Sequence, residues 1–299
     1  MYVTSRSATS SQHADQPATT ALRLAHVEHH VVAAGRPFDD FSRGYFQDLW
    51  QMYDLPWEEE LFTVERNTFH DLVASTRWVD APFELAIMAS TTPDTDPVFP
   101  MAHLAERMGG QAFTFAVSDQ GTAAPFTALR LAAESILPGP VRRALVLIVD
   151  QKARLHRSAV PASITPTVDA VAVLVLESAP GLDRVLVEQA TNVTEGEVAS
   201  RVAEAVSRAA ADGGRVDLVG SAGWLAHGGP AAQHARHAAD GMPCTGLWAA
   251  FAANLPRWRT QGRTVLLVDY DEVLRYLSIC RVDVAAATRL ASSQHGFGR

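Results

Sequence analysis

Apolar residues gather in short continuous runs, with longer amphipathic segments between them. Runs of this length without polar interruption are typical of strands buried on both faces. We predict such strands at residues 83–91, 112–117, 143–150, 169–177, 215–223 and 263–270. Apolar positions spaced three and four residues apart predict helices at residues 97–110, 122–136, 198–214 and 246–258. The alternation of the two kinds of segment predicts a layered α/β fold.

The order strand, helix, strand, helix, strand occurs twice, which suggests an internal structural duplication without a detectable sequence repeat. We expect an N-terminal half at residues 21–160 and a C-terminal half at residues 161–290, which opens with the strand at 169–177. Residues 1–20 are rich in Ser, Thr and Ala and are expected to be a disordered lead-in. Residues 291–299 are expected to be a frayed tail.

Composition narrows the class of protein. With 299 residues, of which 47% are hydrophobic and 19% charged, the chain can bury a large core as ordinary globular proteins do. The net charge of −8 argues against a nucleic-acid surface, which needs a basic stripe. No run of about 18 apolar residues occurs, so no membrane-spanning helix is expected. The two cysteines provide neither a disulfide framework nor metal-ligand spacing, which favours the cytoplasm.

Residues 115–136 combine a buried strand, a turn of small residues and a helix whose first turn is Gly121-Thr122-Ala123-Ala124-Pro125. Condensing enzymes present a nucleophilic cysteine at such a helix N-terminus, where the dipole and free N–H groups lower the pKa of a thiol. This segment contains no cysteine. The scaffold of an acyl-transfer site is therefore predicted without its reactive atom.

Several segments resemble, in order and spacing, the thiolase superfamily and specifically ketoacyl-synthase-III-like proteins. They are FELAIMASTTPDTDPVFP (83–100), GGQAFTFAVSDQGTAAPFTALRLA (109–132), RRALVLIVD (142–150), DAVAVLVLE (169–177), DLVGSAG (217–223), GMPCTGLWAAFAANL (241–255) and TVLLVDYDEVLRYLSICRV (264–282). The resemblance covers roughly residues 80–285. It implies a thiolase-like duplicated α/β layered sandwich with two pseudo-symmetric halves. It also implies a dimer that pairs through the strand at 112–117. Separately, the aromatic-rich segment 41–57 is expected to cover the core as a helix or to form part of an interface.

The family's chemistry needs a cysteine that takes the acyl group as a thioester, together with a histidine and an asparagine that activate the second substrate. By the resemblance, the cysteine position falls on Gly121 or Thr122. The histidine position falls on Ala222, and the asparagine position falls on Met242. None of these positions holds the cysteine, histidine or asparagine that the family's reaction needs there.

The family's glycine-rich turn, whose N–H groups reach the oxyanion, corresponds here to residues 269–273. This turn brings the carboxylates of Asp269, Asp271 and Glu272 towards a site for an oxyanion, and like charges there would raise the barrier. One lost residue could reflect a variant chemistry. Four losses together are better explained by a site that has lost its activity.

Three residues in or near these segments are candidate nucleophiles in place of the cysteine: Ser118, Thr122 and Cys244. We favour simpler interpretations for two of them, with Ser118 and Asp119 as turn and N-cap residues and Cys244 as a small buried residue. No histidine lies at a position matching a base for Ser118. Cys280 is expected in the core.

The histidines do not predict a metal site. His234 and His237 are spaced three residues apart, as ligands on one helical face would be, but no third ligand with a recognised spacing accompanies them. A solvated polar face is the preferred interpretation. His156 lies in the basic segment 152–157, which could bind a coenzyme A or phosphopantetheine phosphate, although a plain surface loop is favoured.

Three functions follow from these observations. The preferred one is a non-catalytic, ketoacyl-synthase-III-like subunit of secondary metabolism (polyketide or fatty-acyl type), paired with an active condensing enzyme and with an acyl carrier protein as a further partner. The second is an acyltransferase or condensing enzyme that acts on acyl-CoA or acyl-carrier thioesters through Ser118, Thr122 or Cys244. The third is a homodimer that binds an acyl thioester without chemistry. No resident cofactor or metal is expected.

Overall fold

The computed structural model describes residues 22–33, 35–78, 82–137, 140–157, 161–179, 183–212 and 215–286. The predicted lead-in at 1–20 and the predicted tail at 291–299 lie outside these ranges. None of the helices in the described ranges is long and apolar enough to cross a bilayer.

The strands form one ten-stranded sheet with the order β3-β2-β4-β5-β1-β6-β10-β9-β7-β8. The first five strands are β1 (Arg23–Val31), β2 (Leu85–Ser90), β3 (Phe113–Val117), β4 (Arg143–Asp150) and β5 (Ala170–Glu177). The other five are β6 (Asp183–Ala190), β7 (Val216–Gly220), β8 (Arg236–His237), β9 (Thr264–Asp271) and β10 (Tyr276–Asp283).

The two halves of this sheet repeat one topology. Outward from the centre the order is β1, β5, β4, β2, β3 on one side and β6, β10, β9, β7, β8 on the other. On each side the first two pairings are antiparallel and the last two are parallel. A short antiparallel contact between β1 and β6 joins the sides. The predicted structural duplication is confirmed by this order.

The strand β5 lies in the first half of the sheet and not in the second half, where it was expected. The run 169–177 was predicted to open the second half, but β5 is hydrogen-bonded between β4 and β1. Strand pairing therefore places the boundary between the two halves between Glu177 and Asp183, and not at residue 160 as predicted.

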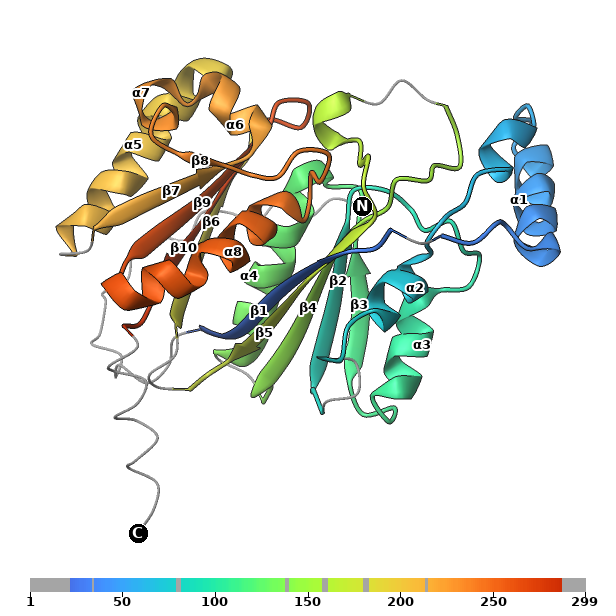
Figure 1. Cartoon of the computed structure of the whole chain (residues 1–299), viewed down its shortest axis with the longest axis horizontal. Coiled ribbons are helices and arrows are strands. Elements are labelled where there is room, and N and C mark those ends of the chain that lie inside the picture. The colour runs from blue at the N-terminus through green and yellow to red at the C-terminus, as the bar shows by residue number, and fades with distance from the viewer. Residues whose placement is uncertain are drawn as a thin grey trace, which may run out of the picture.

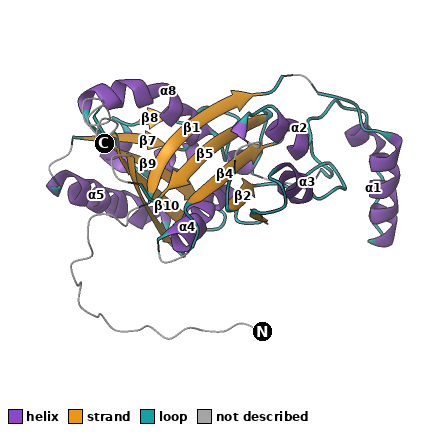
Figure 2. Cartoon of the chain, turned by 90° about the horizontal axis from the view of Figure 1, so that it is seen from below, coloured by secondary structure: helices purple, strands orange, loops and turns teal. Residues whose placement is uncertain are grey.

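Helices and sheet halves form successive layers (Figures 1 and 2). The helices α4 (Ala124–Ile136) and α8 (Gly246–Gln261) lie at the centre, where they pack with the inner faces of both halves in one apolar cluster. The outer face of the first half packs against α2 (Phe69–Ala74) and α3 (Pro100–Arg107). The outer face of the second half packs against α5 (Glu195–Ala211), α6 (Ala222–His227) and α7 (Gly229–Ala232).

The aromatic-rich segment predicted at 41–57 forms α1 (Asp40–Met52), which lies at one end of the molecule (Figure 1). Its Phe46 and Trp50 pack with Phe38, Phe62 and Leu155 in a small cluster of their own. Phe62 belongs to the short helix η1 (Glu59–Phe62). The helix is therefore attached to the body through a separate aromatic cluster and does not cover the main core.

Candidate functional site

Positions that the resemblance assigns to the family's active site come together in space. Thr122, Ala222, Met242, Asp269 and Asp271 line one pocket of about 90 Å³. Thr122 lies in the short helix η3 (Gly121–Ala123) that leads into α4, and the two aspartates lie at the end of β9. Although 149 residues separate them, Thr122 and Asp271 are in hydrogen-bond contact. The order of elements in the two halves brings these segments together.

Gly121 has no room for a side chain. Its φ is +52°, a left-handed conformation that favours glycine, and a Cβ placed on it would lie 1.9 Å from Oδ2 of Asp271. The same Oδ2 accepts a hydrogen bond from the backbone N–H of Thr122 at 3.2 Å. The carboxylate of Asp271 therefore occupies the space that a nucleophile at residue 121 would need, and it engages the next backbone N–H.

Thr122 also has its hydroxyl engaged. It donates to Oδ2 of Asp269 at 2.6 Å, and the Ser221 side chain is hydrogen-bonded to the same carboxyl. Burial raises the pKa of Asp269 to about 6, against the lowering effect of these two hydrogen bonds. The pocket thus presents a buried carboxyl group that titrates near neutral pH, beside a threonine hydroxyl.

The other half has an equivalent arrangement, in which a buried aspartate near the end of a strand contacts the start of a central helix. β2 ends at Ser90, which pairs with Val149, and β7 ends at Gly220, which pairs with Val268. The next residue of β4 is Asp150, and the next residue of β9 is Asp269.

Asp150 contacts the start of the other central helix. Its Oδ2 accepts from the Thr245 hydroxyl and backbone N–H, both at 2.7 Å, and its Oδ1 accepts from the Cys244 N–H at 3.1 Å. Burial raises the pKa of Asp150 to about 6 as well. Each half therefore places a buried aspartate on the N-terminus of the central helix of the other half. The sequence analysis did not identify Asp150. Its partners, Cys244 and Thr245, lie 94 and 95 positions further along the chain, and no local pattern links them to it.

The structure separates the three candidate nucleophiles. Only Thr122 lines the pocket. Cys244 is buried, and burial, followed by the nearby Asp150, raises the pKa of its thiol. Ser118 lies in the wall of a different cleft, where its hydroxyl donates to Oδ2 of Asp119 at 3.0 Å. Neither Ser118 nor Asp119 caps a helix, because the N-cap positions before η3 and α4 are Gln120 and Ala123.

The histidines expected on one helical face do not share one. His234 is exposed in a turn after α7, and His237 belongs to β8. His227, at the end of α6, lies 3.8 Å from both Glu195 and Glu272. No group of three metal-binding side chains occurs within the described ranges.

The basic segment 152–157 is largely neutralised by carboxylates. Lys152 lies 3.5 Å from Asp169, and Arg157 pairs with Glu58 at 3.2 Å and also with Glu60. These contacts favour the interpretation as a structural loop over that of a phosphate site.

Solved structures of condensing enzymes share this architecture. AbyA1, a tetronic acid condensing enzyme, has a TM-score of 0.60 and 16% identity, over 88% of this chain and 99% of that chain. OleA from Xanthomonas campestris, solved with lauric acid and lauroyl-CoA, has a TM-score of 0.58 and 14% identity, over 89% and 99%. A 3-oxoacyl-(acyl-carrier protein) synthase from Burkholderia xenovorans LB400 has a TM-score of 0.60 and 14% identity, over 89% and 95%.

No protein-family model matches the sequence, and neither does any curated protein. At identities this low, the likeness to solved structures concerns the fold alone. The chain has the thiolase-like α/β fold of 3-oxoacyl-(acyl-carrier protein) synthase III and related condensing enzymes.

Proposed function

We propose that this protein is a non-catalytic, ketoacyl-synthase-III-like subunit that pairs with an active condensing enzyme in a pathway that handles acyl thioesters. The observation that carries the proposal is the position of Asp271. Its carboxylate fills the space beside Gly121 and accepts a hydrogen bond from the N–H of Thr122. A developing oxyanion needs free N–H donors and is repelled by a carboxylate, so the pocket is unsuited to the family's reaction.

The fold supports pairing at one end of the sheet. β3 is an edge strand, hydrogen-bonded only to β2 among the described strands. Its Phe113 is 68% exposed, and Phe99 nearby in sequence, at the start of α3, is 61% exposed. Unpaired edges with exposed apolar side chains are where another chain adds to a sheet. The proposed partner therefore pairs along β3, as the resemblance implies for dimers of this family.

The first test is chemical. The purified protein is incubated with acyl-CoA and acyl-carrier thioesters, and its intact mass is measured. The proposal expects no covalent adduct. An adduct that forms on the wild type and disappears in Thr122→Val or Ser118→Ala would overturn it.

A second candidate is acyl transfer through Thr122, with Asp269 as the base. It is supported by the 2.6 Å hydrogen bond between the Thr122 hydroxyl and a carboxyl group with a pKa near 6. It expects an adduct on the wild type whose formation increases above about pH 6, where Asp269 is ionised. Thr122→Val should abolish this adduct, and Ser118→Ala should leave it unchanged.

The second test is assembly. We expect co-expression with condensing enzymes from neighbouring reading frames to yield, for one of them, a complex with one copy of each chain. The complex should condense acyl thioesters at a rate that the other chain alone does not reach. A condensing enzyme that is fully active without this chain, and forms no complex with it, would contradict the proposal.

A further inference from the structure

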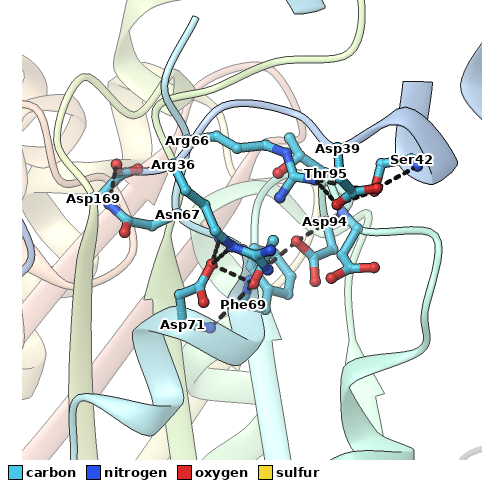
Figure 3. Close-up of polar contacts among 12 residues, drawn as sticks. Arg36, Asp39, Ser42, Arg66, Asn67, Phe69, Asp71, Asp94, Thr95 and Asp169 are labelled. Atoms are coloured by element: carbon cyan, nitrogen blue, oxygen red, sulfur yellow. Dashed lines mark hydrogen bonds and ion pairs between the residues drawn. The ribbon is translucent and has the colours of Figure 1, made fainter. Parts of the chain in front are cut away.

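The segment that carries α1 projects from the body of the molecule as an arm (Figures 1 and 2), which we define as residues 39–65 and call the α1 arm. Buried polar contacts fix its base. Arg66 is fully buried, donates to Oγ of Ser42 at 3.1 Å and lies 3.7 Å from Oδ2 of Asp39 (Figure 3). Asp39 in turn caps α1, because its Oδ1 accepts from the Ser42 N–H at 2.7 Å. The arm is therefore held in place before a partner arrives, which lowers the entropic cost of docking.

The two faces of α1 have different surroundings. One face packs into the aromatic cluster through Phe46 and Trp50. The opposite, outer face consists of exposed residues at the spacing i, i+4, i+7 and i+11, which are Phe41, Tyr45, Asp48 and Met52. Phe41 is 68% exposed and Met52 is 74% exposed. A stripe of apolar side chains this exposed is typical of a surface that another protein covers.

The outer face of α1 continues to the edge strand β3 through an apolar cleft of about 480 Å³. The cleft is lined by Tyr45 from the arm, by Phe99 at the N-cap of α3 and by Ala116 from β3, among others. A partner that pairs along β3 would therefore meet the outer face of the α1 arm as well, as one continuous apolar surface.

The α1 arm also carries most of the negative charge of the chain. It holds eight Asp and Glu residues and one Arg, which is a net charge of −7 against −8 for the whole chain. The chain has 33 acidic and 25 basic side chains, so 25 and 24 of them lie outside the arm, close to balance. Arg43 in the arm and Arg157 outside it pair with three of the carboxylates. Asp40, Asp48 and Asp54 are exposed and form no ion pair within the described ranges.

We propose that the α1 arm docks on a basic surface of the partner condensing enzyme, and that its charge excludes a second copy of this chain from the same place. The inference rests on the proposed function and adds the chemistry of the partner. The aromatic and Met side chains supply the apolar contact, and lysines or arginines of the partner neutralise the carboxylates around it. A second copy would bring another arm of the same charge to the interface, and the rest of its chain has no excess of cations to compensate.

Self-association tests the exclusion without any partner. The full chain is measured by sedimentation equilibrium at about 0.1 M and about 1 M salt, between which the Debye length falls from about 10 Å to about 3 Å. The wild type should be monomeric at the lower salt. Asp40→Asn/Asp48→Asn/Asp54→Asn should dimerise there at a concentration at least about tenfold below that needed by the wild type, because like charges no longer meet. Adding Phe113→Lys should restore the monomer, which places the contact at the β3 end.

The complex with the condensing enzyme found by co-expression tests the docking. Its dissociation constant, measured by isothermal titration, should rise at least about tenfold between the two salt concentrations. The three substitutions in the arm should weaken the complex at least about tenfold at the lower salt and much less at the higher. The matched control is Glu188→Gln/Glu204→Gln/Asp212→Asn, which makes the same change of net charge at exposed positions of the second half. It should alter neither self-association nor the complex.

The results separate this inference from the proposed function. A complex that responds neither to salt nor to the three substitutions would overturn the docking alone. If no candidate enzyme forms a complex, the proposed function fails and the docking fails with it. A wild type that dimerises at the lower salt, or a neutralised variant that stays as monomeric as the wild type, would show that charge does not exclude a second copy.

Discussion

At the residue scale, one close approach decides what the pocket can do. Gly121 is constrained by its positive φ and, independently, by the carboxylate of Asp271. That carboxylate is itself held in place, because its Oδ1 accepts from the N–H groups of Val273 and Leu274 at 3.0 and 2.9 Å. The side chain therefore shapes its own turn while it fills the space next to residue 121.

We predict that Gly121→Ala lowers the free energy of unfolding by more than backbone strain alone. Strain in the left-handed region costs about 1 kcal/mol, and the clash with Asp271 should raise the loss above about 2 kcal/mol. Urea denaturation of both single variants and of Gly121→Ala/Asp271→Ala measures the coupling. Gly109→Ala is the control, because Gly109 also has a positive φ, of +72°, but nothing lies within 4 Å of its Cβ position. Additive effects of Gly121→Ala and Asp271→Ala, within about 0.5 kcal/mol, would contradict the clash.

At the element scale, the two central helices are held by reciprocal contacts. Asp269 of β9 binds Thr122 before α4, and Asp150 of β4 binds Thr245 at the start of α8. A carboxylate is favourable at a helix N-terminus, but burial makes its ionised form costly. The pocket at Thr122 thus repeats a structural contact that the other half also has.

These contacts predict a pH dependence of stability. The pKa of Asp269 is raised from 3.8 to about 6 on folding, so the native state holds its proton more tightly than the unfolded chain. Its stabilising contribution is complete below about pH 4 and is lost as the pH rises through 6, by about 3 kcal/mol. Relative to the wild type, Asp269→Asn should therefore gain stability between about pH 4 and pH 7, as measured by urea denaturation. Asp48→Asn, at an exposed position, should show no such trend. A constant difference between Asp269→Asn and the wild type would contradict the assignment.

At the scale of the whole molecule, exposed apolar side chains gather on α1, on the start of α3 and on the edge strand β3. They are Phe41, Tyr45, Met52, Phe99 and Phe113. In Figure 1, α3 and β3 lie at the side of the first half, and α1 projects beyond them, away from the second half. The proposed partner would cover this end.

We predict that charges on β3 prevent pairing and leave the fold intact. Phe113→Lys with Thr114→Lys places two cations on an edge strand, a common natural device against edge-to-edge association. Light scattering should show loss of the complex with the condensing enzyme, and circular dichroism should be unchanged. Val273→Lys is the control, because Val273 is 52% exposed but lies in the second half, after β9. An intact complex in the β3 variant would place the interface elsewhere.

The sequence was sufficient for elements that are apolar on both faces. The strands β2, β4, β5 and β9 and the helix α4 were predicted, because continuous apolar runs and helical spacing are local signals. β1 and β6 were not predicted, since their Arg, His, Glu and Gln residues interrupt any continuous apolar run. The helix predicted at 246–258 contains Pro256 and continues to Gln261, because packing in the central core outweighs the hydrogen bond that proline cannot donate.

For the site, the residue identities at 121, 122, 222 and 242 are visible in the sequence, and the resemblance predicts from them that the family's cysteine, histidine and asparagine are absent. The contacts that these positions make depend on the tertiary structure. The Asp271 carboxylate lies against Gly121, and the Asp269 carboxyl accepts from Thr122, across separations of about 150 residues. No local pattern encodes such distances. They follow from the pairing of β9 within the duplicated sheet and from the packing of α4 between its halves.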